Sequence, residues 1–288
     1  MIKKVTVFQK SDKSDAFTMV LKDPTNVTQY SGFAIDKIDG LGPVDAEINT
    51  SEMVIDGDHF NSARVGKRNI VMDLIFYSEV GDGIEDVRHR SYQLFPMKRN
   101  VYVEVETTNR KVWTQGNVEK NEPNIFSEIS GNQVSLICPD PKWYDSDDEI
   151  DQNLAINDDT AVNYTGEIEV GGYLELVIGT AITKPISGGE AAFHVSCGNP
   201  SGEIEYFDIY TPAEGFAVGD KLTICSIEGS KSCIYTDTAD ADKNAINLLG
   251  QNPEWIKLTP GYNSFRVTDI YNALSSAKYT SKICYEGV

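Results

Sequence analysis

Short runs in which apolar and polar residues alternate recur along the chain, and this period of two is typical of β-strands with one buried face. In the first half, such runs occupy residues 2–8, 70–77, 101–107 and 133–138. Glycine, proline and aspartate residues separate the runs, as turns between short strands require. The first half is therefore predicted to be mainly β.

One segment of the first half has helical spacing instead. Between Gly83 and Pro96, apolar residues recur every three or four positions, at Ile84, Val87, Tyr92 (or Ser91), Leu94 and Phe95. Acidic residues come early, basic residues follow, and proline ends the segment, which matches the helix dipole and the helix-stop signal. We predict one helix here, which makes the first half an α+β domain.

The second half, from residue 158 onward, alternates more regularly. It holds about nine short alternating runs separated by turn residues, without a long helical pattern between them. Parallel βαβ units need such helices, whereas an antiparallel sandwich does not. We therefore predict an all-β second domain, and a chain that is mainly β.

The stretch Ile38–Tyr77 is predicted to form two strands joined by a glycine-rich loop. Arg64, Lys67 and Arg68 lie together just before the strand that starts at Ile70. We expect them to form a basic loop tip. In an otherwise acidic chain, such a tip is a candidate contact with another protein.

Charge and turn residues suggest where the domains meet. An acidic run follows two prolines, so we interpret residues 145–157 as a solvated linker between a first domain, 1–144, and a second domain, 158–288. The chain holds 25 basic and 44 acidic residues, a net charge of −19. Because phosphates would be repelled, this balance argues against nucleic-acid or anionic-membrane partners. The sequence also lacks a secretory signal and a membrane-length apolar run, so we expect synthesis in a cytoplasm without membrane insertion.

Metal and cofactor chemistry finds little support in the sequence. The five cysteines contain no C-x-x-C pair and are interpreted as reduced core thiols. His59, His89 and His194 have no partner at metal-ligand spacing, and Asp240–Asn244 begins like a calcium loop but lacks its glycine and glutamate. We expect no metal, no cofactor and no enzymatic activity.

Two chemical alternatives stay open. Paired carboxylates flank the scissile bond in glycosidases, and this chain has candidate pairs, although a solvated sheet face also explains them: Glu167/Glu169 and Glu203/Glu205. Aromatic residues of the second half can form a platform for a sugar or pack in the core: Trp255, Tyr262, Tyr206 and Tyr210.

Several short segments follow one another in a specific order. They are Gly40-Leu-Gly-Pro-Val, Asp56-Gly-Asp-His-Phe, Arg68-Asn-Ile-Val-Met, the helix with Arg88 and Tyr92, Gly116-Asn-Val-Glu, Glu122-Pro-Asn-Ile-Phe, Val134-Ser-Leu-Ile-Cys-Pro-Asp-Pro-Lys-Trp143 and Trp255-Ile-Lys-Leu-Thr-Pro-Gly-Tyr-Asn263. Together they resemble the distal tail protein (Dit) family of long, non-contractile-tailed phages and related prophages of Gram-positive bacteria. The resemblance extends over nearly the whole chain.

This resemblance implies a first domain that forms a homo-hexameric ring at the distal tail tip of the virion, and a galectin-like β-sandwich as the second domain. It also implies that the ring connects the tail tube protein to a tail-tip hub or tail-associated lysin and to a receptor-binding protein. The alternative is a lectin-like protein that binds host cell-wall saccharides. Because a closed ring needs complementary patches on each subunit, our ring-interface candidates are Arg64, Lys67, Arg68, Arg88 and Tyr92.

Overall fold

The computed structural model describes residues 1–22, 32–77, 83–124, 130–183 and 190–288. The chain falls into two compact units, Met1–Asp147 with Tyr285–Val288, and Asp148–Cys284. Strands dominate both units, and one α-helix occurs among the described residues. The predicted fold class, mainly β with one helix in the first half, is confirmed.

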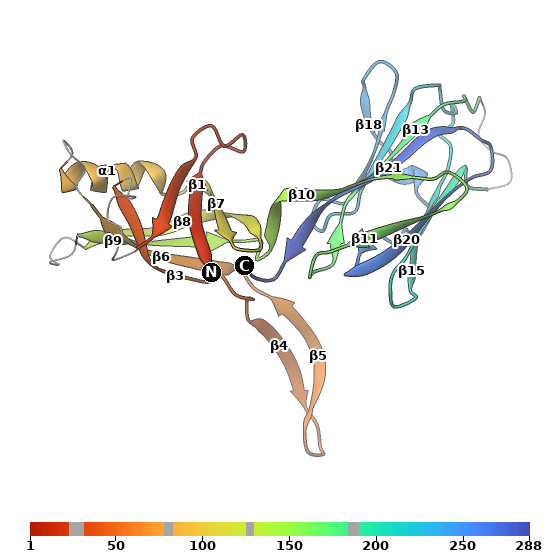
Figure 1. Ribbon diagram of the computed structural model, residues 1–288. Helices are drawn as coiled ribbons and strands as arrows, with labels where there is room; N and C mark the ends of the chain where they lie inside the picture. Colours follow the sequence, from red (N-terminus) through yellow and green to blue (C-terminus); the bar gives the residue numbers. More distant parts are fainter. Residues whose placement is uncertain (23–31, 78–82, 125–129, 184–189) are drawn as a thin grey trace. The chain divides into compact units, whose positions relative to one another are not determined.

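Seven strands of the first unit close into a barrel (Figure 1). In order around the barrel, they are β1 (Ile2–Phe8), β2 (Phe17–Leu21), β3 (Phe33–Asp39), β6 (Arg68–Phe76), β9 (Gly131–Cys138), β8 (Lys111–Asn124) and β7 (Asn100–Thr107). The barrel closes because β1 pairs with both β2 and β7, and β9 pairs with both β6 and β8. The β2–β3 pair is parallel, and the other six pairs are antiparallel.

Strand β6 shows how the alternating sequence builds the barrel core. Ile70, Met72 and Leu74 are buried, whereas Val71 and Asp73 between them are partly solvated. Successive side chains of a strand point to opposite faces, so each apolar residue in this series faces the barrel interior. The period of two in the sequence therefore corresponds to side chains that alternate between the interior and the outer surface of the barrel.

Helix α1 (Ile84–Leu94) confirms the predicted helix. At its start, the Gly83 backbone N–H donates to Asp86 Oδ2 at 3.0 Å. Val87 and Ser91 are the buried residues of the helix, and Asn132 Nδ2 of β9 donates to Ser91 Oγ at 3.3 Å. Ser91 therefore faces the barrel, and Tyr92 is exposed to solvent.

The stretch Ile38–Tyr77 differs from the prediction. Between β3 and β6 the chain inserts a separate two-stranded hairpin, β4 (Ala46–Glu52) and β5 (Asp58–Val65). The tip of this hairpin is residues 53–57, which hold no basic residue. The predicted basic loop tip is wrong: Arg64 lies near the base of the hairpin, Lys67 lies between β5 and β6, and Arg68 starts β6.

Arg68 is 1% exposed, so it is not a surface contact. As the first member of the inward-facing row of β6, it points its guanidinium group to the inside of the unit. Its Nε and two terminal nitrogens donate to four backbone carbonyls at 2.5–2.8 Å, those of Pro141, Gly40, Gly42 and Glu286. The guanidinium carbon also lies 5.2 Å from the centre of the buried Trp143 ring.

These four carbonyls belong to three separate chain segments. Gly40 and Gly42 lie between β3 and the hairpin, Pro141 lies between β9 and the next strand, and Glu286 lies near residue 288. Val288 N–H adds a bond to the Leu41 carbonyl at 3.1 Å. One side chain therefore ties the root of the hairpin to two other parts of the unit.

The acidic segment that we interpret as a linker is instead part of a strand, β10 (Trp143–Leu154). Cations of neighbouring strands offset its carboxylates. Lys111 of β8 pairs with Asp147 at 3.2 Å, and β21 (Leu274–Tyr285) contributes the pairs Lys278–Asp151, at 2.8 Å, and Lys282–Glu149. The linker interpretation considered only the local charge of the acidic run. It could not include these lysines, because they come from distant positions in the sequence.

The second unit is a two-sheet β-structure. One sheet continues from β10 through β21, β13 (Tyr173–Ile178), β16 (Lys221–Cys225), β17 (Ser232–Thr236) and β18 (Asp242–Asn244). The other has the order β11 (Asp159–Tyr164), β20 (Gly261–Asp269), β14 (Phe193–Gly198) and β15 (Ile204–Ile209). Two short strands, β12 (Val170–Gly171) and β19 (Lys257–Leu258), pair with each other, and a 3-10 turn spans Ile246–Leu248.

Side chains of both sheets of the second unit meet in its core. The ring of Phe265 on β20 lies 4.8 Å from the ring of Tyr279 on β21. Leu176 and Val195, one from each sheet, are fully buried. This arrangement confirms the all-β prediction for the second half.

We predict that Arg68→Met destabilises the first unit by about 3 kcal/mol or more, because it leaves four buried carbonyls without their donors. Urea unfolding followed by circular dichroism measures this change. The matched control is Arg64→Met, whose exposed side chain bonds to Glu47, and for which we expect a change below about 1 kcal/mol. Equal, small effects of the two variants would show that Arg68 does not hold the unit together.

Candidate functional site

The hairpin β4–β5 is the most exposed element of the first unit. Every residue of both strands is exposed to solvent, and the two strands form a sheet of their own (Figure 1). Figure 1 shows the hairpin standing out from the barrel, on a different side from α1. A lone two-stranded hairpin is at best marginally stable in water. The hairpin therefore has the features of a segment that another protein covers.

One face of the hairpin is polar and internally bonded. Arg64 Nε donates to Glu47 Oε2 at 2.7 Å across the two strands. Asn49 Nδ2 donates to Ser62 Oγ at 3.2 Å, on the same face. Such cross-strand pairs stabilise a sheet by small amounts each and hold the strand register.

The opposite face of the hairpin is apolar. Its cross-strand pairs are Ala46–Val65, Ile48–Ala63 and Thr50–Phe60. Ile48, Phe60 and Val65 are 63%, 59% and 55% exposed. The tip adds three exposed apolar side chains, those of Met53, Val54 and Ile55. We call Ile48, Phe60 and Val65 the apolar hairpin face.

Sequence reasoning missed this face. A register shift between Asn49 and Thr50 marks a β-bulge, and the bulge adds one residue to β5 between Phe60 and Ala63. The alternation of β5 is broken at that point, so its apolar residues do not fit a single period of two. The Asp56-Gly57 pair was the signal in the sequence that could have predicted this hairpin, because Asp-Gly between two extended runs is typical of a hairpin turn.

The structure separates the five predicted interface residues. Arg64 and Lys67 are exposed near the base of the hairpin, and Arg68 is buried. Arg88 and Tyr92 lie on α1, where an Arg88 terminal nitrogen is 3.3 Å from Glu85 Oε1 and the Tyr92 ring lies 6.2 Å from the His89 ring. Arg64 and Lys67 at the hairpin and Tyr92 on the helix therefore remain as exposed candidates, whereas Arg88 is partly buried.

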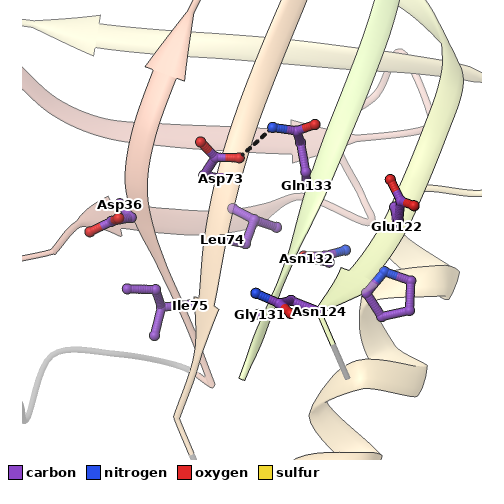
Figure 2. A pocket seen from close by; sticks show the side chains of 10 residues that line it. Asp36, Asp73, Leu74, Ile75, Glu122, Asn124, Gly131, Asn132 and Gln133 are labelled. Atoms are coloured by element: carbon purple, nitrogen blue, oxygen red, sulfur yellow. Dashed lines mark hydrogen bonds between the residues drawn. The ribbon is translucent and has the colours of Figure 1, made fainter. Parts of the chain in front are cut away.

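A hollow of about 500 Å³ lies on the barrel wall, over β3, β6, β9 and β8 (Figure 2). Its carboxylates already have partners. Asp73 Oδ1 accepts from Gln133 Nε2 at 2.9 Å, Asp36 pairs with Lys22 at 3.2 Å, and Glu122 pairs with Lys120. Among the described residues, its lining holds no histidine, cysteine, serine or lysine, so these residues offer no nucleophile with a matching base.

The two carboxylates of the Glu203/Glu205 pair lie in different surroundings. Glu205 lies opposite the buried Cys197, and its Oε2 accepts the Lys257 backbone N–H at 2.6 Å. Burial raises the pKa of Glu205 despite this hydrogen bond. Glu203 precedes β15 and accepts from Asn199 Nδ2 at 3.0 Å. The interpretation of Glu203 and Glu205 as one solvated face is therefore wrong for Glu205.

The part of the chain that the structure describes has neither a metal-ligand cluster nor a membrane-spanning helix. No group of three or more histidine, cysteine, aspartate or glutamate side chains there is arranged to hold a metal ion. Within the same residues, no helix is long and apolar enough to cross a membrane.

Comparison with known proteins gives similarity at the level of structure. No family model matches the chain, and no curated protein matches its sequence. The crystal structure of the Dit protein of phage SPP1, described as a paradigm of the hub adsorption apparatus in phages that infect Gram-positive bacteria, matches with a TM-score of 0.63. It is 15% identical, and the match covers 87% of this chain and 93% of the SPP1 chain.

The baseplate of phage P2 in its activated conformation provides two further matches. The structure with calcium matches at a TM-score of 0.50 and 11% identity over 100% of both chains. The structure with strontium matches at a TM-score of 0.50 and 12% identity over 99% of both chains. The resemblance seen in the sequence is therefore confirmed in three dimensions: this chain has the fold of a Dit protein from phages that infect Gram-positive bacteria.

Proposed function

We propose that this chain is a structural protein of a phage tail tip, a distal tail protein whose first unit assembles into a hexameric ring. The observation that carries this proposal is the exposed hairpin β4–β5, with its apolar face, in a chain that has the Dit fold. In this role, the ring joins the tail tube protein to a tail-tip hub or tail-associated lysin and to a receptor-binding protein. The protein acts by assembly at the distal tip of the virion and catalyses no reaction.

The geometry of the first unit suits a closed ring. A heterologous ring needs two different patches on each subunit, because the patch on one copy meets the other patch on the next copy. The apolar hairpin face supplies the first patch. Helix α1 supplies the second, since Ile84 and Tyr92 are both exposed on it. The hairpin and α1 lie on different sides of the barrel (Figure 1), so patches on these two elements can meet different neighbours in a ring.

The hydrophobic effect provides the driving force for this contact. Full burial of a valine, isoleucine or phenylalanine side chain is worth about 1.5–3 kcal/mol. Ile48, Phe60 and Val65 are each more than half exposed in the single chain, so most of this free energy becomes available only when a partner covers them. Cross-strand bonds on the polar face keep the hairpin extended before it binds.

We predict that Ile48→Ser combined with Phe60→Ser converts the ring into monomers, because it removes the two largest side chains of the apolar hairpin face. Size-exclusion chromatography with light scattering of the full chain measures the assembled mass. The thermal midpoint of the monomer stays close to wild type, since these side chains touch solvent. The control is Val218→Ser, which removes an equally exposed apolar side chain from the second unit. Unchanged rings in the double variant would exclude this hairpin face as a ring contact.

A charge contribution at the hairpin base gives a separate prediction. Arg64→Glu with Lys67→Glu places like charges beside Glu47, and we expect a smaller ring fraction, most clearly at low salt where screening is weakest. Arg68 is left intact because it is buried. Lys3→Glu with Lys10→Glu changes the net charge equally on another part of the unit. Equal ring fractions for both double variants, across a salt series in the same chromatography, would rule out an electrostatic role of Arg64 and Lys67.

A further inference from the structure

The outer face of the sheet β11–β20–β14–β15 carries polar and aromatic side chains in register. Phe193, Val195 and Cys197 of β14 are buried, whereas the alternate residues His194, Ser196 and Gly198 face outward. Opposite them on β20 stand Thr268, Arg266 and Ser264. The face thus presents hydroxyl, imidazole and guanidinium groups side by side on neighbouring strands.

Two tyrosines are exposed on this face. Tyr262 on β20 is 72% exposed, and Tyr206 on β15 is 38% exposed. The Tyr206 ring lies 5.4 Å from the His194 ring, and His194 Nδ1 lies 2.8 Å from Asp208 Oδ1. The aromatic ring of Tyr206 is therefore held in place before any ligand arrives, which lowers the entropic cost of binding.

The charged side chains on the same face are compensated locally. An Arg266 terminal nitrogen lies 3.1 Å from Asp159 Oδ1 across the β11–β20 pair, and Asp208 is bonded to His194. In a chain with a net charge of −19, this face offers paired charges and neutral hydroxyl groups. It is complementary to an uncharged ligand whose groups both donate and accept hydrogen bonds.

The face is unobstructed at Gly198, on the strand between those of the two tyrosines. A Cβ atom placed on Gly198 would be 3.9 Å from the Ser264 carbonyl and 4.0 Å from Ile204, and would meet nothing closer. Gly198 pairs with Ser264 on one side and with Ile204 on the other, and Ser264 pairs with Ala161. Gly198 has no side chain, so the surface of the sheet at this point of β14 is open to a ligand.

We propose that this outer face is a saccharide-binding site. A sugar ring has an apolar face of C–H groups that packs on Tyr262 or Tyr206, and hydroxyl groups that bond to Arg266, Ser196 and His194. Of the two alternatives given for the aromatic residues, packing in the core does not hold for these two tyrosines, because both are exposed. This site adds a binding activity to the assembly role and does not depend on it.

An array of immobilised bacterial cell-wall saccharides, probed with the full wild-type chain, tests the proposal. We expect capture by a subset of the saccharides, retained at high salt because the charges of the face are already paired. Gly198→Val covers the open surface at this point of β14 without backbone strain, and Tyr262→Ala removes a stacking surface. Each variant should weaken binding about tenfold or more, with an unchanged thermal midpoint and unchanged ring assembly.

The control is Tyr271→Ala, which removes an exposed tyrosine outside the four strands of this sheet and should leave saccharide binding intact. Three outcomes would overturn the proposal: no saccharide captures the wild-type chain, Gly198→Val binds as well as wild type, or Tyr271→Ala loses as much binding as Tyr262→Ala. Ring formation is measured separately by light scattering, so the failure of one proposal leaves the other unaffected.

Discussion

The first unit depends on the burial of one guanidinium group. Arg68 satisfies four backbone carbonyls from three chain segments and packs over Trp143, and among the described residues it has no carboxylate in hydrogen-bond contact. Burying a charge is costly unless hydrogen bonds compensate, so this arrangement is stable only when all three segments are in place. Gly40 adds to the constraint: its φ is +84°, and a Cβ there would lie 2.0 Å from the Asn69 carbonyl oxygen. Together they fix where the hairpin leaves the barrel.

Because the base of the hairpin is held in place, the hairpin is suited to its proposed role as a contact between copies. A flexible loop would lose conformational entropy on docking, whereas a hairpin with a held base and bonded cross-strand pairs loses less. In the proposed ring, the barrel serves as a rigid support and the apolar hairpin face is the part that a neighbouring copy covers. The second unit contributes a different surface, a polar and aromatic sheet face. Its chemistry suits a small hydroxylated ligand better than another protein.

Local patterns predicted much of the fold, because barrel strands such as β6 and helix α1 have simple periods. They failed where distant residues decide the outcome. The acidic run is part of β10, where Lys111, Lys278 and Lys282 lie beside its carboxylates. Arg68 was expected at the surface because the sequence does not show which carbonyl groups its side chain will meet. The apolar hairpin face was not predicted, because a β-bulge breaks the alternation of apolar and polar residues in β5. Of the predicted site, only the general region around Arg64 and Lys67 coincides with that hairpin.

Negative-stain electron microscopy of the purified full chain tests the central claim most directly, since it shows the assembly itself. The proposed hexameric ring, in which the apolar hairpin face binds the next copy head-to-tail, predicts closed rings of six subunits with a central channel. Two results would contradict the claim that this chain builds a closed tail-tip ring. The first is single particles under conditions in which the apolar hairpin face is shown to be solvent-accessible. The second is open filaments in place of rings.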